Sequence, residues 1–206
     1  MDAKRGAGAR AAMLALILAT GLGAMPARAQ FSESYNFLKA VRDRDGDKVT
    51  TIVSKPGTTI INTKDYSTGE SALHIVVARR DLQWLSFLLA KGADPNIRDS
   101  KGMTPLARAA ELGWVDGARL LISVGASVNT TNDRGETPLI LAVQRRDLPT
   151  VKLLLDNGGD PRLADHIAGM SALDYAQRDN RSPAILRAIQ EAKPAKPAAQ
   201  VAGPKL

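Results

Sequence analysis

Apolar and polar positions recur along most of the chain in units of about 33 residues. Each unit opens with Gly, a variable residue and Ser or Thr, and continues into a mainly apolar segment, as in G-M-T-P-L-A-R-A-A and G-E-T-P-L-I-L-A-V. The openings begin at Gly69, Gly102, Gly135 and Gly169, which lie 33, 33 and 34 residues apart by their numbering. A fixed period of this length is typical of a fold built from stacked repeats.

One unit has the pattern of two short helices separated by turns. In the unit that opens at Gly102, Thr104 supplies a capping hydroxyl, and Pro105 takes the first helical position, where its missing N–H costs no hydrogen bond. Gly113 ends this helix, and the apolar stripe of a second helix stops at Gly125. A single unit leaves its apolar face exposed, so the copies must stack on one another.

These segments resemble the ankyrin repeat family. The family's opening G-x-T-P-L-H-x-A-A and its ending L-L-x-x-G-A-D-x-N match in register through successive units. The resemblance implies an all-α solenoid of stacked helix-turn-helix repeats with short hairpin-like turns, and a role in binding protein. It divides the chain into an N-terminal capping helix pair (30–66), three full repeats (about 67–99, 100–132 and 133–165) and a C-terminal capping repeat (166–191).

The two ends of the chain differ from the repeats. Residues 1–29 contain a basic stretch, a 14-residue apolar run from Ala11 to Ala24 and a small-residue exit, the three parts of a secretory signal. Because a membrane-spanning helix needs roughly 20 apolar residues, we expect cleavage after Ala29, export to the periplasm or beyond, and no stable membrane insertion. Residues 192–206 are mostly Ala, Pro and Lys, which predicts a disordered tail.

Composition narrows the possible chemistry. The chain has no Cys, which excludes disulfides, thiolate catalysis and Cys-ligated zinc. Its net charge is +7, and removal of residues 1–29, with four basic residues and one acid, leaves +4. A mildly basic chain outside the cytoplasm is not expected to bind nucleic acid.

The alternating acids from Asp43 to Asp47 suggest a calcium loop but lack its other ligands. Counted from Asp43, the sixth and twelfth positions are Lys48 and Ser54, whereas an EF-hand loop has Gly and Glu there. The repeat register instead makes this stretch the turn between the helices of the first pair. We therefore expect no metal here.

The two histidines do not indicate a catalytic site. His74 and His166 have no metal-binding spacing and no partner acid or nucleophile nearby in sequence. The resemblance implies a structural hydrogen-bonding role for His74, and His166 is expected to be exposed in the last turn. No phosphate loop or Ser-His-acid pattern occurs either. We expect neither an enzyme nor a cofactor.

Arginines recur where the first helix of each unit should end, and the middle unit interrupts the series. The positions are Arg42, Arg44, Arg79, Arg80, Glu111, Leu112, Arg145, Arg146 and Arg178. Stacking would gather these arginines into a basic ridge on the concave side, where they could bind acidic groups of a partner. Alternatively, each arginine complements the dipole of its helix and stays solvated.

The turn tips offer further candidates for contact with a partner. They are Ser67, Thr68 and Glu70; Ser100, Lys101 and Met103; and Asp133, Arg134 and Glu136. Their varied chemistry fits a specific protein surface, and it equally fits a neutral one. Trp84 and Trp114 are interpreted as core residues. Gly117, inside a second helix, costs roughly 0.5 to 1 kcal/mol relative to Ala, which predicts that the middle repeat is the loosest.

Taken together, the sequence predicts a monomeric, non-catalytic module that binds another protein through its concave face and turn tips. Two alternatives stay open. One is an immunity or inhibitor protein that blocks an enzyme directed to the periplasm. The other is an envelope stress-protection factor, whose Ala/Pro/Lys tail would tether it to anionic envelope material.

Overall fold

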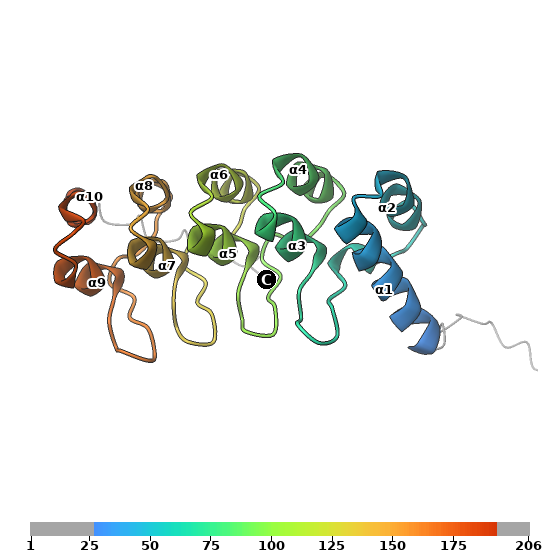
Figure 1. Cartoon of the computed structure of the whole chain (residues 1–206), viewed down its shortest axis with the longest axis horizontal. Helices are drawn as coiled ribbons and strands as arrows, with labels where there is room; N and C mark the ends of the chain where they lie inside the picture. The colour runs from blue at the N-terminus through green and yellow to red at the C-terminus, as the bar shows by residue number, and fades with distance from the viewer. Residues whose placement is uncertain (1–26, 193–206) are drawn as a thin grey trace, which may run out of the picture.

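A computed structural model describes residues 27–192 as helix pairs stacked side by side in one elongated solenoid (Figure 1). The elements are α1 (Ala27–Asp43), α2 (Gly46–Val53), the short 3₁₀ helix η1 (Ile60–Asn62), α3 (Ala72–Ala78), α4 (Leu82–Ala90), α5 (Pro105–Leu112), α6 (Val115–Ser123), α7 (Pro138–Arg145), α8 (Leu148–Asp156), α9 (Ala172–Arg178) and α10 (Pro183–Glu191). No strand occurs among these elements of 27–192. The predicted all-α solenoid is confirmed.

Most of the two chain ends lies outside the described residues. The predicted signal segment up to residue 26 and the predicted tail from residue 193 fall there. The expected cleavage point after Ala29 lies in the first turn of α1. Signal cleavage and the tail's role therefore stay predictions from sequence.

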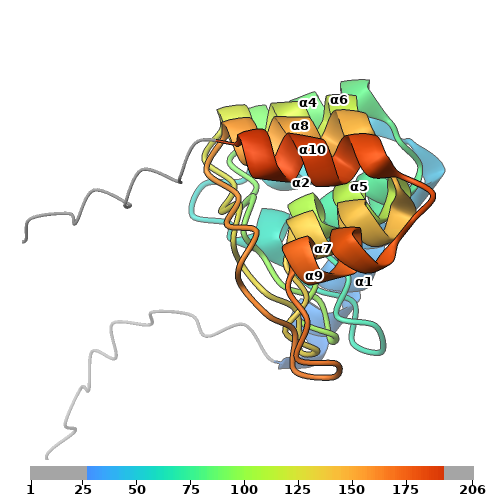
Figure 2. The ribbon, with the colours of Figure 1, turned by 90° about the vertical axis from the view of Figure 1, so that its left-hand side faces the viewer.

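The helices form two layers. Seen along the solenoid, α4, α6, α8 and α10 lie in one layer and α3, α5, α7 and α9 in the other, with long hairpin-like turns extending from the second layer (Figure 2). We call these turns fingers; they comprise residues 63–70, 98–103, 131–136 and 164–170. The odd-numbered helices and the fingers together form what we call the inner face.

The first helices of the two middle pairs, α5 and α7, begin where the sequence predicts. The hydroxyl of Thr104 accepts a hydrogen bond from the backbone N–H of Ala107 at 3.2 Å, and that of Thr137 accepts one from Ile140 at 3.2 Å. Proline follows each of these threonines at the start of its helix. These caps satisfy backbone donors that a helix start otherwise leaves free, typically worth about 1 kcal/mol each.

The core runs continuously between the two layers. Leu73, Leu106 and Leu139 occupy equivalent positions in successive first helices and are fully or almost fully buried. Leu121 and Leu154 face them from the second helices. Complete burial of one such side chain contributes roughly 1.5 to 3 kcal/mol, so stacking supplies the stability that a single unit lacks.

The fingers are joined edge to edge through their backbones. The N–H of Ser100 donates to the carbonyl of Thr68 at 3.1 Å, that of Asp133 to Lys101 at 3.1 Å, and that of His166 to Arg134 at 2.8 Å. Because each bond joins one finger to the next, the fingers extend the inner face as a connected row.

One Asp or Asn closes each finger into a fixed shape. The side-chain oxygen of this residue accepts hydrogen bonds from two backbone N–H groups two to four residues later in the chain. The residues are Asp65, Asp99, Asn132 and Asp165. Side chains of Asp and Asn commonly close turns in this way, so the finger shape is encoded locally.

Gly117 has a packing role that the sequence interpretation missed. A Cβ at this position would lie only 2.1 Å from Cε3 of Trp114, so the indole ring occupies the space beside the glycine. Trp114 is buried, as predicted. Gly117 thus lowers helix propensity but lets the Trp114 ring pack against the helix backbone. The looseness of the middle repeat stays a prediction.

Candidate functional site

Arg79, one of the predicted ridge residues, binds the neighbouring helix pair. Its Nη1 donates to the carbonyls of Val41 at 2.8 Å and Arg42 at 3.0 Å, at the C-terminal end of α1. Its guanidinium lies 6.0 Å from the ring centre of Trp84, and only 23% of its side chain is exposed. Burial lowers the pKa of Arg79 from its usual value. This arginine closes the junction between α1 and α3.

Three other predicted arginines have left-handed backbone conformations. Arg44, Arg80 and Arg146 have φ angles of 60°, 55° and 62°, a conformation that costs a residue with a Cβ roughly 1 to 2 kcal/mol. All three side chains bridge to the following repeat. Arg44 lies 3.1 Å from Asp81, Arg80 donates to the carbonyl of Leu112 at 2.6 Å, and Arg146 donates to Asp179 at 2.5 Å.

The basic ridge is therefore not a row of free side chains. Arg42 also forms an ion pair, with Asp65 at 2.8 Å, and Nη1 of Arg178 lies 2.9 Å from the sulfur of Met170. Neither interpretation from sequence anticipated bridges between repeats. A helix C-terminus favours a cation, but here most of these arginines are positioned by carbonyls and carboxylates of a neighbouring repeat, either the preceding or the following one.

Three predicted contact residues are not exposed as expected. Met103 and Glu136 are buried, and Leu112 is half-buried against the core. The reason for the first two is that the base of each finger faces the next repeat: the amide of Asn132 contacts the sulfur of Met103 at 3.4 Å and donates to Glu136 at 2.8 Å. By contrast, Ser100, Lys101, Asp133 and Arg134 are exposed.

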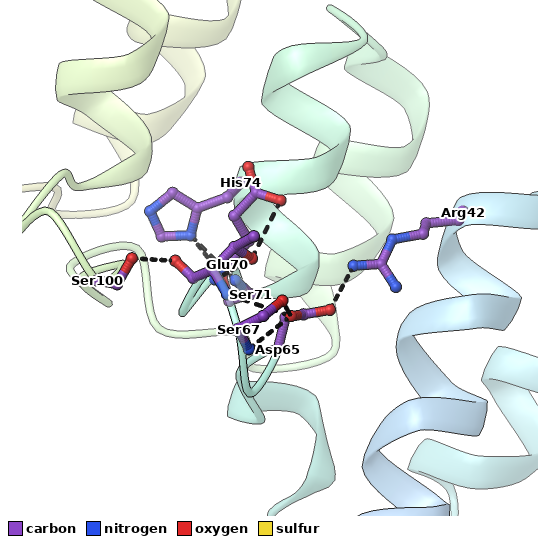
Figure 3. Close-up of polar contacts among 8 residues, drawn as sticks. Arg42, Asp65, Ser67, Glu70, Ser71, His74 and Ser100 are labelled. Atoms are coloured by element: carbon purple, nitrogen blue, oxygen red, sulfur yellow. Dashed lines mark hydrogen bonds and ion pairs between the residues drawn. The ribbon is translucent and has the colours of Figure 1, made fainter.

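His74 is a buried structural residue. Its Nε2 lies 2.9 Å from the carbonyl of Met103 in the next finger. Its Nδ1 accepts from the backbone N–H of Ser71 at 3.2 Å (Figure 3). Since a carbonyl only accepts, Nε2 carries the proton. Burial lowers the pKa of His74, which favours this neutral form. The structural role implied by the family resemblance agrees with this geometry.

The first finger has an ionic contact of its own. Asp65 accepts from the Ser67 hydroxyl at 2.7 Å and from Arg42 of α1 at 2.8 Å (Figure 3). These hydrogen bonds hold the pKa of Asp65 well below its usual range. Asp65 thus fixes the first finger to the capping helix pair, and it does not offer a free carboxylate to a ligand.

A pocket on the inner face brings together four of the predicted contact residues. The cavity has a volume of about 320 Å³ and lies where α5, α7 and the finger 131–136 meet. It is lined by Glu111, Arg134, Glu136, Leu141, Gln144 and Arg145. Leu141 and Gln144 were not singled out from sequence, although Gln144 stands at the position in its repeat that Glu111 holds in the preceding one.

The two acids of the pocket already have partners. Glu111 accepts from Arg108 at 2.7 Å. Glu136 accepts from Asn132, and its other oxygen lies 3.6 Å from Arg134, whose side chain is 64% exposed. Arg145, in contrast, has no hydrogen bond or ion pair to any residue in 27–192. The pocket therefore offers one cation that forms no direct ion pair with the described residues.

A glycine explains why the pocket opens at this junction. Gly113 takes the left-handed position that Arg80 and Arg146 hold in the flanking repeats, with a φ of 65°. It has no side chain to bridge to α7. Nε of Arg145 lies 2.5 Å from where a Cβ of Gly113 would be, so Arg145 occupies the space left by the glycine.

Neither a metal centre nor a spanning helix is seen within the described part of the chain. Its His, Asp and Glu side chains form no group of three or more that could hold a metal ion. None of its helices is both long enough and apolar enough to cross a membrane.

Comparison with known proteins gives a family match over most of the chain and short local matches to longer proteins. The family model described as ankyrin repeats (3 copies) matches residues 37–132 and 121–197. An L-asparaginase from Dirofilaria immitis is 45% identical over 56 residues, 27% of this chain and 9% of that protein. Oxysterol-binding protein homolog 1 from Saccharomyces cerevisiae is 38% identical over 73 residues, 34% of this chain and 6% of that protein. The chain spans less than a tenth of either relative.

Proposed function

Because the chain belongs to the ankyrin repeat family, whose repeats generally mediate protein–protein interactions, we propose that it is a non-catalytic module that binds a partner protein on its inner face. The partner covers the pocket between α5 and α7 and the adjoining finger tips. The observation that carries this proposal is the pocket itself, where charged side chains from two helices and a finger converge around Leu141.

The size of the pocket favours a protein partner over a small molecule as the main ligand. Its volume of about 320 Å³ is at the lower end of the roughly 300 to 1,000 Å³ typical of small-molecule sites. A stable protein interface buries about 800 Å² on each partner, which requires the surface around the pocket as well. The finger tips extend that surface.

The finger tips carry apolar side chains suited to an interface. Tyr66 is 92% exposed at the tip of the first finger, and Ile167 is 70% exposed at the tip of the last. Aromatic side chains such as Tyr66 are enriched at protein interfaces. Lys101 and Arg134 lie between them on the two middle fingers, so the row of tips offers apolar ends and a basic centre to a partner with an acidic or mixed surface.

The periplasm is the proposed location, and the protein is proposed to act there as a monomer. The location rests on the sequence of residues 1–29, with its basic stretch, short apolar run and small-residue exit. Fractionation of cells that express the full chain would show the protein in the periplasmic fraction and shortened at its N-terminus. Recovery of full-length protein in the cytoplasm would contradict this location.

Site-specific photocrosslinking in intact cells tests the binding proposal. A photoreactive amino acid replaces Gln144, which lines the pocket, or Lys152, an exposed residue of α8 in the outer layer. We expect a discrete adduct with one partner from position 144 and none from position 152. Equal labelling at both positions, or no adduct at 144, would contradict the proposal. The identity of the captured protein would also distinguish an inhibitor of a periplasmic enzyme from a general scaffold.

A further inference from the structure

The charged side chains that line the pocket differ in whether they have a hydrogen-bond or ion-pair partner. Glu111 is held by Arg108, and Glu136 is held by Asn132 and Arg134. Since each acid has a cation or amide beside it, neither needs a cation from outside. Arg145 is the lining charge that forms no hydrogen bond or ion pair within residues 27–192. The pocket is therefore complementary to an anion.

The equivalent arginine two repeats earlier shows which contacts the side chain of Arg145 lacks. That residue, Arg79, donates to the carbonyls of Val41 and Arg42. One repeat later, the equivalent position is held by Asp179, which accepts from Arg146. Asp147 also lies close to Gly113, but it accepts from the Thr150 hydroxyl and forms no ion pair with Arg145. The donors of Arg145 are thus available to a ligand.

The remaining lining residues restrict which anion fits. Leu141 provides an apolar surface, and Gln144 contributes an amide next to Arg145 on α7. The carboxylates of Glu111 and Glu136 line the same cavity, so a doubly charged phosphate would meet more repulsion than a singly charged carboxylate. A guanidinium matches a carboxylate with two parallel N–H donors.

We propose that this pocket anchors the side-chain carboxylate of a partner glutamate, bound by Arg145 while the methylene groups of the glutamate pack on Leu141. The proposal rests on the proposed protein-binding function and specifies the chemistry of the partner at one point. Arg145 is the binding residue, and Gly113 is a positioning residue because its missing side chain gives Arg145 its place.

Nuclear magnetic resonance with short blocked peptides tests the anchor without knowledge of the partner. The probes are acetyl-Gly-Glu-Gly-amide, its Gln counterpart, a phosphoserine counterpart and acetyl-Gly-Gly-Gly with a free C-terminus. We expect the Glu peptide to shift the Arg145 Nε–H and Gln144 amide signals with saturation in the millimolar range. The Gln peptide should leave these signals unchanged.

Matched variants show whether Arg145 itself binds the probe. Arg145→Gln should weaken binding of the Glu peptide at least about tenfold, as expected for loss of a charge-assisted bidentate contact. Arg119→Gln, which removes an exposed arginine of α6 in the outer layer, should leave binding unchanged. Circular dichroism confirms that both variants are folded.

Several results would overturn the carboxylate anchor. They are equal shifts with the Gln peptide, tighter binding of the phosphoserine or free C-terminal peptide than of the Glu peptide, and unchanged binding by Arg145→Gln. One outcome is that crosslinking from position 144 captures a partner that binds wild type and Arg145→Gln with equal affinity. In that case the protein-binding function is retained and the carboxylate anchor is wrong. If position 144 captures no partner, the proposed function fails as well.

Discussion

Two junctions between neighbouring helix pairs differ in their arginine contacts, although the same repeat positions form both. They are the junction between α1 and α3 and the junction between α5 and α7. At the first, Arg79 binds the carbonyls that end α1, and Arg44 bridges to Asp81. At the second, Gly113 replaces the bridging arginine, and Arg145 has no partner within residues 27–192. One position thus stabilises the stack in one repeat and is available for binding in another.

This difference shows how a solenoid separates stability from recognition. Most junctions are closed by arginines that reach from one repeat to the next, as with Arg80 and Arg146. Omission of that bridge at one junction leaves a cavity without opening the core, because Leu106 and Leu139 stay fully buried beneath it. Nearest-neighbour contacts in repeat proteins contribute separately, so one junction can differ while the others hold the stack.

The largest effect is expected from truncation of the two equivalent arginines. Arg79→Ala should lower the free energy of unfolding by about 2 to 3 kcal/mol, because it removes two charge-assisted hydrogen bonds and the contact with Trp84. Arg145→Ala should change it by less than about 0.5 kcal/mol, as for an exposed side chain without partners. Urea unfolding followed by circular dichroism measures both. Equal losses would mean that the two junctions do not differ.

A second test is the variant Gly117→Ala in the middle repeat, for which the free energy of unfolding should change by about 2 kcal/mol. By helix propensity alone, Gly117→Ala should stabilise the protein by roughly 0.5 to 1 kcal/mol. Because the new methyl group would collide with the Trp114 ring, we expect destabilisation of about 2 kcal/mol instead, as in overpacked cores. Thermal unfolding distinguishes the two signs. A stabilised variant would show that the α5–α6 repeat is loosely packed.

Gly113→Ala should combine a stability loss of about 1 kcal/mol with a binding defect. The loss comes from a Cβ in the left-handed conformation. Gly125→Ala is the matched control, because Gly125 has a φ of 92° and nothing within 4 Å of its Cβ position. Both variants should lose similar stability, but only Gly113→Ala should weaken binding of the Glu peptide by displacing Arg145. If both variants bind the Glu peptide equally well, Gly113 does not position Arg145 for binding.

The smallest effect is expected in the first finger and depends on pH. Asp65→Asn should keep the turn, since Asn132 closes the equivalent finger, but it loses the charge that pairs with Arg42. We expect a loss of about 0.5 kcal/mol at pH 7. Because the folded-state pKa of Asp65 is lowered, its contribution is complete above its unfolded pKa of about 3.9.

This contribution declines as the pH falls below that value and disappears once Asp65 is protonated in the folded state. The difference between wild type and Asp65→Asn in urea unfolding should therefore stay constant between pH 7 and pH 5 and shrink as the pH falls below about 4. If the difference in unfolding free energy between the two proteins grows on acidification, a group other than Asp65 causes the pH dependence. Asp133→Asn, in which the more exposed Asp133 loses its 3.3 Å ion pair with Arg98, serves as a comparison for the loss of an exposed ion pair.

The sequence predicted the parts of the fold that local rules determine. The helix caps at Thr104 and Thr137 follow from residue type and position, and stacking follows from the apolar stripe. Register also placed Glu111 and Arg145 on the same side of the solenoid. These features need no knowledge of neighbouring repeats.

The contacts between repeats could not be predicted in the same way. A long arginine side chain can extend to either neighbour, and only the structure shows that Arg79 extends back to α1 while Arg80 extends on to Leu112. Met103 and Glu136 were misplaced because a turn in sequence does not show which of its residues face the next finger. One signal was readable, since Gly113 replaces an arginine of the flanking repeats.

Crosslinking from the same repeat position along the whole solenoid tests the central claim most directly. Ala78, Glu111, Gln144 and Arg178 are equivalent, exposed residues near the ends of α3, α5, α7 and α9. With a photoreactive residue at each in turn, we predict the highest yield of one partner adduct at 111 and 144, which flank the open junction, and little at 78 and 178. An even yield at all four positions, or a maximum at 78 or 178, would contradict a binding site centred between α5 and α7.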